Sequence, residues 1–176
     1  MVTLKPDLET RLAEDHPQVD SLRDGREPEH LQAIRLWLRL LTCTNLITTE
    51  IRTRLRESFQ TTLPRFDLLA QLERHPQGLK MGELSRRMMV TTGNITGITD
   101  QLEAEGLVRR AVDPRDRRSF TVKLTPQGRK VFAEMARVHE GWVIEFFSGL
   151  GAAEKDSLFT LLGRLKAHLN GKEARP

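Results

Sequence analysis

Apolar residues recur at helical spacing in two long stretches near the ends of the chain. Over residues 29–57 they follow steps of three and four, which predicts one amphipathic helix of roughly 40 Å. A leucine stripe over residues 158–169 predicts a last helix. Thr125 as cap and Pro126 in the first turn predict the helix before it, which ends near residues 149–151. The first and last helices carry more apolar surface than a small domain buries, so we expect them to pack against a second chain; the alternative is that both pack within one chain.

Three shorter helices are predicted in the middle of the chain. The first begins at Pro64, which is tolerated in a first turn, and ends near His75. The second begins at about Met81. The third follows Thr91, whose hydroxyl is expected to cap it, and ends at Gly106.

A β-hairpin is predicted directly after these helices. Its strands cover residues 107–112 and 119–124, and Asp113 with Pro114 supplies the turn. One buried face is expected on the second strand, from the alternating apolar residues Phe120, Val122 and Leu124. Four charged residues remain for the tip: Arg115, Asp116, Arg117 and Arg118. Such a tip indicates a surface for nucleic acid, because arginine enters narrow minor grooves; the alternative is a solvated charged turn.

The charge distribution favours the same partner. Residues 1–29 hold eight acidic and four basic residues, so this segment carries −4 and the rest of the +4 chain carries +8. A basic body suits a polyanion, although basic composition alone does not establish a nucleic-acid partner. Residues 1–28 contain prolines and no sustained periodicity, which predicts an acidic, flexible N-terminal arm.

Several function classes find no support in the sequence. The five histidines are scattered and form no catalytic or zinc motif, so we expect neither an enzyme nor a bound metal or other cofactor. The longest uncharged run, residues 88–99, has 12 residues, whereas a membrane span needs about 20 apolar ones. The single cysteine, Cys43, fits a reducing cytoplasm. It lies on an apolar stripe, which predicts an inert core thiol, with a peroxide sensor as the alternative.

The helix after Thr91 is the candidate reading element. At 100° per residue its apolar residues face inward, and Gly93, Thr96, Gly97 and Asp100 face outward. A glycine in a helix interior costs about 1 kcal/mol relative to alanine, so two on one face indicate close approach to a DNA groove or to another helix. Asp100 is interpreted as an orienting residue. The predicted DNA contacts, with those of the hairpin tip, are Thr91, Thr92, Gly93, Asn94, Thr96, Gly97 and Asp100.

These helices, Gly106-Leu107-Val108 and the run DPRDRRSFTVKLT resemble MarR-family winged helix-turn-helix regulators over about residues 30–170. The family's wing pattern is met by Asp116, Arg118, Val122, Leu124 and Thr125. The resemblance implies that Arg118 enters the minor groove and that Asp116 holds it there. The chain departs from the family at Lys80-Met81-Gly82, where a Ser or Thr cap is common.

The expected fold is therefore mainly α with a small β-hairpin wing. A winged helix-turn-helix covers residues 63–124, and dimerisation helices cover residues 29–62 and 125–170. The expected partners are double-stranded DNA and a second copy of the chain. A homodimer would read a palindrome with half-sites about 34 Å apart.

An effector is the remaining expected partner. The stretches LWLRLLTCTNL and TLPRFDLLAQL resemble the part of the family that controls aromatic-acid catabolism and responds to aryl-CoA thioesters. Cations and an aromatic plane for a small anionic aromatic compound are offered by Arg35, Trp37, Arg39, Thr42, Asn45 and Arg65. The alternative is that these arginines are surface groups lying along a helix. Together these features predict a ligand-released cytoplasmic repressor; a structural helical dimer or adaptor without sequence-specific DNA binding is the other interpretation.

Overall fold

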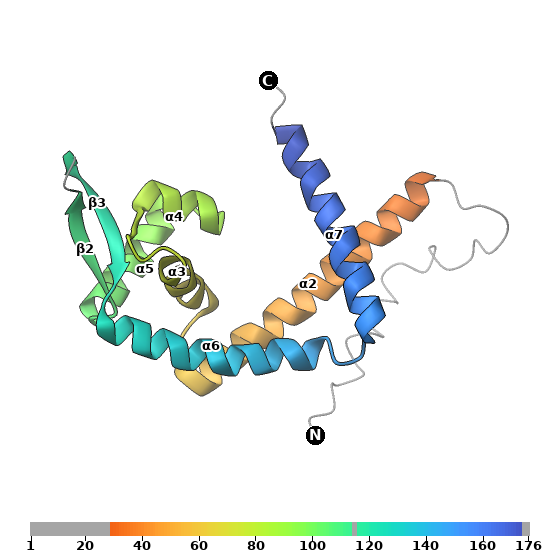
Figure 1. Cartoon of the computed structure of the whole chain (residues 1–176), viewed down its shortest axis with the longest axis horizontal. Helices are drawn as coiled ribbons and strands as arrows, with labels where there is room; N and C mark the ends of the chain where they lie inside the picture. Colours follow the sequence, from red (N-terminus) through yellow and green to blue (C-terminus); the bar gives the residue numbers. More distant parts are fainter. Residues whose placement is uncertain (1–28, 114–115, 174–176) are drawn as a thin grey trace. The chain divides into compact units, whose positions relative to one another are not determined.

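The computed structural model describes residues 29–113 and 116–173, with the backbone alone for Asp113 and for residues 116–119 and 172–173. The predicted acidic arm, residues 1–28, lies outside the described residues. The elements in chain order are α2 (Glu29–Phe59), α3 (Leu63–Glu73), β1 (Leu79–Lys80), α4 (Met81–Met88), α5 (Thr92–Ala104), β2 (Val108–Asp113), β3 (Asp116–Leu124), α6 (Pro126–Phe146) and α7 (Ala152–Glu173) (Figure 1). The predicted mainly helical fold with a small hairpin is confirmed.

Two predicted helix starts have the expected side-chain cap, and a third lacks one, as expected. The Thr91 hydroxyl accepts a hydrogen bond from the Asn94 backbone N–H at 3.4 Å, and Thr125 accepts one from Gly128 at 2.9 Å. Helix α4 follows Lys80, which makes no side-chain capping hydrogen bond. The first turns of α5 and α6 are thus fixed by side chains, whereas that of α4 is not.

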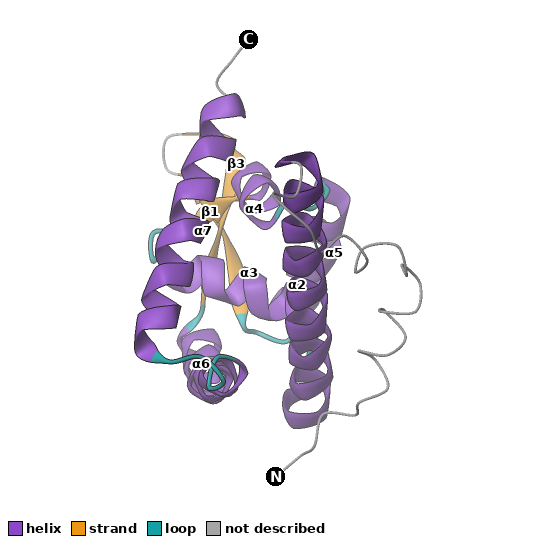
Figure 2. Cartoon of the chain, turned by 90° about the vertical axis from the view of Figure 1, so that its right-hand side faces the viewer, coloured by secondary structure: helices purple, strands orange, loops and turns teal. Residues whose placement is uncertain are grey.

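The sheet is antiparallel, with the order β1-β3-β2. It is drawn in orange beside α3 and α4 in Figure 2. Strands β2 and β3 stay in register from Val108 opposite Leu124 to Val112 opposite Phe120, after which the register shifts and Asp113 opposes Asp116. Strand β1 was not predicted, because two residues are too short to show an alternating pattern.

The second hairpin strand is longer than the sequence predicts, whereas the first has the predicted length and is shifted by one residue. We expected Asp116, Arg117 and Arg118 in the turn, and this prediction was wrong: all three belong to β3. The reason is physical, since strand pairing uses the backbone and continues past an irregularity such as the register shift at Val112. Polar side chains therefore do not end a strand when its backbone still has a partner.

The core of the winged domain lies where α3, α4 and α5 meet the base of the hairpin. Fully buried leucines from these helices, such as Leu68 and Leu84, pack with Ile95 of α5 and Val122 of β3. The expectation that Phe120 is buried was wrong, because its side chain is 47% exposed. The helices cover the inner face of the sheet only at its base, and Phe120 lies farther out along the hairpin.

Helix α6 is held to the domain by aromatic contacts. The ring of Phe66 in α3 lies 5.5 Å from that of Phe132 and 4.8 Å from that of His139. Burial among these rings lowers the pKa of His139 below its ordinary value. Near the end of α2, Arg54 donates to both carboxylate oxygens of Glu145, at 2.6 and 3.2 Å. These contacts fix the direction in which α6 leaves the hairpin.

Groups of exposed apolar side chains lie on two of the described helices. On α2 they are Ile34, Leu36, Trp37 and Leu41, and on α7 they include Leu158, Phe159, Leu161, Leu162, Leu165 and Leu169. No side chain of residues 29–48 is buried in the single chain. Cys43 is among the exposed residues, so the predicted core thiol is wrong for the single chain. Among the described helices, none combines the length and apolar character that crossing a bilayer requires.

Candidate nucleic-acid interface

The outward face of α5 carries the residues that the sequence assigns to it. Gly93, Thr96, Gly97 and Asp100 are exposed, whereas Ile95 and Leu102 are fully buried on the opposite face. Thr99 is also fully buried, and its hydroxyl lies 3.9 Å from the sulfur of Met81. Sequence reasoning missed Thr99, because a polar side chain gives no apolar signal. The helix is nevertheless oriented as predicted.

Open space surrounds the two glycines of this face. A Cβ atom built on Gly93 or Gly97 meets no heavy atom within 4 Å apart from the helix's own backbone. In the part of the chain that the structure describes, therefore, no second helix packs against them. Of the two interpretations that the sequence left open, close packing of another described helix of the same chain on these glycines is excluded, and an outside partner can reach this face.

One threonine in the first turns of α5 already uses its hydroxyl hydrogen in a hydrogen bond within the helix. Thr96 donates its hydroxyl hydrogen to the carbonyl oxygen of Thr92 at 3.0 Å. This bond leaves the methyl group and the oxygen lone pairs of Thr96 for a partner. Thr91, Thr92 and Asn94 are exposed in the first turn, where backbone N–H groups favour anions.

Arg110 of β2 joins the hairpin to the reading helix. Its backbone N–H donates to Oε1 of Glu103 at 2.8 Å, and its Nη1 donates to Oε2 of the same carboxylate. Its Nη2 donates to Oδ1 of Asp100. The Asp100 carboxylate, with Glu103, raises the pKa of the Arg110 guanidinium above its ordinary value. One side chain thus connects the wing with two turns of α5.

The Arg110 contacts give Asp100 a defined role. An unpaired carboxylate on this face would repel phosphates, but here its charge is paired with a guanidinium. The sequence predicted an orienting role for Asp100 and did not single out Arg110. A signal was present: strand alternation puts Arg110 on the face of Val108, and Asp100 and Glu103 are three residues apart on one side of α5.

The predicted wing contacts are described only in part. Arg115 lies outside the described residues, and for Asp116, Arg117 and Arg118 the backbone alone is described. Their backbones continue β3 outward from the core (Figure 1). The pairing of Arg118 with Asp116 stays a prediction.

The predicted effector residues fall into two groups. In a helix at 100° per residue, Arg35, Arg39 and Thr42 share one side of α2, whereas Trp37 lies about 160° away from both arginines. Arg65 in the first turn of α3 is ion-paired with Glu105, and its Nε is buried without a hydrogen-bond partner. Asn45 is exposed and lies between the two groups, about 80° from both Trp37 and Arg35.

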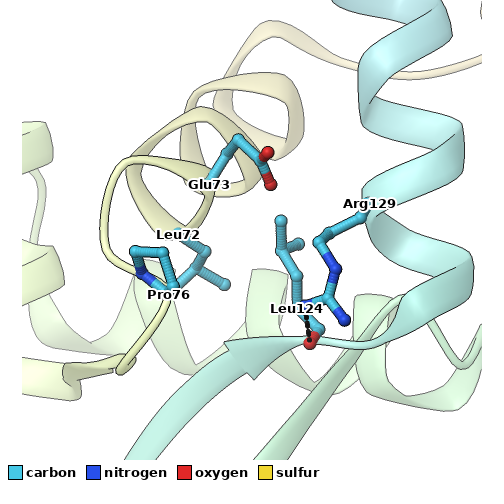
Figure 3. A pocket seen from close by; sticks show the side chains of 5 residues that line it. All are labelled: Leu72, Glu73, Pro76, Leu124 and Arg129. Atoms are coloured by element: carbon cyan, nitrogen blue, oxygen red, sulfur yellow. Dashed lines mark hydrogen bonds between the residues drawn. The ribbon is translucent and has the colours of Figure 1, made fainter.

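Neither of two hollows found among the described residues matches an aromatic ligand. Figure 3 shows one of about 50 Å³, lined by Leu72, Glu73, Pro76, Leu124 and Arg129. Ligand pockets for compounds of drug size measure roughly 300 Å³ or more. A depression of about 420 Å³ on α7 is lined by residues of that one helix and has no opposite wall. Among the described side chains, no three His, Cys, Asp or Glu residues are grouped as metal ligands would be.

Comparison with known proteins agrees with this geometry. The model of the MarR family matches residues 61–120, the helix-turn-helix and most of the wing. The transcriptional activatory protein BadR of Rhodopseudomonas palustris is 35% identical over 122 residues, which are 66% of this chain and 69% of BadR. The chain belongs to the MarR family. Membership confirms the winged helix-turn-helix fold and the class of transcriptional regulators rather than enzymes.

Two further transcriptional regulators are similar to this chain over different shares of its length. An uncharacterized HTH-type transcriptional regulator of Bacillus subtilis, YkoM, is 34% identical over 95 residues, which are 54% of this chain and 60% of YkoM. The crystal structure of the transcriptional regulator BldR from Sulfolobus solfataricus superposes with a TM-score of 0.67 at 29% identity. It covers 78% of this chain and 99% of BldR. The chain thus spans between three fifths and about two thirds of the length of the two curated relatives.

Proposed function

We propose that this MarR-family regulator binds a palindromic DNA operator as a homodimer, represses transcription there, and is released by a small anionic aromatic compound or its CoA thioester. The observation that carries the proposal is the open outer face of α5, where Gly93 and Gly97 border Thr96 and no described side chain lies above either glycine. A face of this kind can lie deep in a major groove.

The proposed contacts divide into three kinds. The Thr96 methyl contacts thymine methyl groups and Asn94 bonds adenine, while Thr91 and Thr92 bind phosphates at the start of α5. Arg118 enters the minor groove, with Arg115 and Arg117 near the backbone. Because several cations meet phosphates, affinity should fall steeply with salt.

The exposed apolar faces of α2 and α7 support the homodimer. Apolar side chains line both helices in the single chain, and a second copy would cover them. The competing interpretation, a structural helical dimer or adaptor, uses the same faces but gives no sequence preference on duplex DNA. Specific binding of one duplex over a scrambled one separates the two interpretations.

We expect Gly97→Ala to stabilise the protein and to weaken operator binding. The added methyl meets open space in the free protein, and alanine is favoured over glycine in a helix by about 0.5–1 kcal/mol. In the complex the same methyl enters the groove and lowers affinity by about tenfold, the scale of an overpacked contact. Chemical denaturation and fluorescence anisotropy on the same preparations measure the two effects.

Gly141→Ala is the matched control. Gly141 also lies inside a helix with no heavy atom within 4 Å of its Cβ position, but outside the reading face. It should gain similar stability and keep full affinity. If Gly97→Ala binds the operator as well as Gly141→Ala, α5 does not approach DNA through its glycine face and the proposed reading surface is wrong.

The proposed effector site uses the arginine side of α2. Arg35, Arg39 and Thr42 share that side, and guanidinium groups bind carboxylates and phosphates through paired hydrogen bonds. Since the hollow in Figure 3 is too small for such a compound, the remaining walls, with Arg65, Trp37 and Asn45 as candidates, would come from the assembled dimer. A hundredfold loss of operator affinity requires that the effector prefer the DNA-free conformation by about 3 kcal/mol.

We expect benzoic acid or benzoyl-CoA to release operator DNA in an anisotropy titration, and Arg39→Gln to shift the midpoint to higher concentration. Loss of the guanidinium removes the charge-assisted contact but leaves α2 helical. Two controls should release little DNA: benzyl alcohol, which has the same ring but no negative charge, and free CoA, which has the same nucleotide but no aromatic acyl group. Equal release by benzyl alcohol would contradict an anionic effector. A promoter-reporter assay separates repression from the activation that the name of BadR states for that protein.

A further inference from the structure

The inner face of the β2–β3 hairpin changes character from base to tip. In an antiparallel ladder, directly opposed residues point to the same side. Val108 and Leu124 form the first pair on this face and are buried in the core. Arg110 and Val122 form the next pair, and Arg110 reaches Asp100 of α5. This face of the hairpin is therefore the one turned toward the reading helix.

The third pair on this face is apolar and exposed. Val112 opposes Phe120, and their side chains are 54% and 47% exposed. Both lie beyond the last core residues of the hairpin and before the part of it that carries the arginines. On one side of this pair Arg110 is ion-paired with two carboxylates, and on the other β3 continues with its arginines. The exposed apolar pair therefore calls for a partner that is apolar at the pair and anionic on its outer side.

We propose that Val112 and Phe120 form a platform for the deoxyribose rings of bound DNA, between the major-groove contact of α5 and the minor-groove contact of the wing tip. The inference rests on the proposed reading surface. Sugars at the edges of the grooves present C–H surface, and their phosphates would meet the arginines farther out on β3. The pair lies on the same face of the hairpin as Arg110, which is hydrogen-bonded to Asp100 and Glu103 of α5. The platform therefore adjoins the proposed DNA-binding face of α5.

The platform positions the protein and carries no base preference. Sugar contacts fix the register of a protein on the duplex, whereas groove contacts read sequence. The platform should therefore strengthen binding to operator and to random duplex by the same factor. It should also leave the salt dependence unchanged, because it neutralises no phosphate.

The test compares the full-length protein with Phe120→Thr and Val112→Thr. Threonine keeps the strand preference of the hairpin and removes apolar surface. We expect each substitution to lower affinity by about fivefold on both duplexes, from the apolar area that is no longer buried, with an unchanged slope of log affinity against log salt. Phe120→Leu retains an apolar side chain and should bind within about twofold of the wild type.

Hydroxyl-radical footprinting reports the contact directly, because the radical attacks deoxyribose. Wild-type protein should protect the sugars between the two groove contacts, and Phe120→Thr should lose that protection. Methylation protection of guanine N7 in the major groove should persist in the variant, since α5 still binds. Thermal unfolding of each variant confirms that the hairpin is folded, and Val112→Thr gives a second, more conservative probe of the same platform.

Three outcomes overturn the inference in distinguishable ways. If the wild type prefers its operator and protects guanines, but Phe120→Thr keeps full affinity and the full sugar footprint, the platform alone is wrong. If sedimentation shows that Phe120→Thr dissociates the assembly, the pair belongs to a contact between copies of the chain. If the wild type neither prefers an operator nor protects guanines, the proposed function itself fails.

Discussion

Gly128→Ala is expected to destabilise the winged domain by about 3 kcal/mol or more, beyond the usual range of core overpacking, because the obstacle is backbone. A Cβ atom on Gly128 would lie 1.9 Å from the carbonyl oxygen of Leu107. That carbonyl also accepts the backbone N–H of Thr125 at 3.0 Å. The start of α6 and the start of the hairpin therefore meet with no room for a methyl group.

The substitution breaks more than one contact. To admit the methyl group, α6 must move from Leu107, and the bond from the Thr125 hydroxyl to the Gly106 carbonyl, 2.7 Å in the wild type, is stretched with it. Urea denaturation at fixed protein concentration measures the loss, since stability of an oligomer depends on concentration. Gly141→Ala in the same helix is the control and should be slightly stabilised. Equal stability of the two variants would show that α6 does not pack on the hairpin this closely.

The sequence predicts the helices well because their signals are local. Thr91 and Thr125 cap the helices that they were expected to cap, and Gly106, with a φ of 72°, ends the reading helix. Periodicity also predicts which side of α5 is buried. These features depend on residues within one or two turns, so neighbouring positions in the chain contain the information.

What the sequence did not predict depends on contacts between distant segments. The pairing of Leu79 with Val122 joins residues more than forty positions apart, and a two-residue strand carries no pattern. Alternation predicts the side on which Phe120 lies but not how far the core extends along it. In the same way, spacing suggests that Asp100 and Glu103 share a face without indicating that Arg110 of another element occupies it.

Arg110→Ala should weaken operator binding by about hundredfold, the scale seen when one partner of a hydrogen-bonded charge pair at an interface is truncated. The variant loses the tether between β2 and α5, so wing and helix no longer hold the relative position that two grooves require. It also leaves Asp100 and Glu103 without their guanidinium partner beside the DNA phosphates. Folding stability should fall by only about 1 kcal/mol, because the pairs are partly solvent-exposed. Anisotropy over a range of salt concentrations measures the binding loss.

Substitutions that remove charge distinguish the two causes of the weaker binding, the lost link and the unpaired carboxylates. Adding Asp100→Asn and Glu103→Gln to Arg110→Ala removes the repulsion between the carboxylates and the DNA phosphates but does not restore the link between β2 and α5. Binding should therefore recover in part, and the remaining defect should persist at high salt. Arg110→Lys keeps a cation without the planar fork and should lie between the wild type and alanine. Arg109 is an exposed neighbour on the opposite face of β2. Arg109→Ala removes the same charge but leaves the contacts between Arg110 and α5 in place. If it weakens binding as much as Arg110→Ala, the effect is general electrostatics, and the wing and the reading helix act independently on DNA.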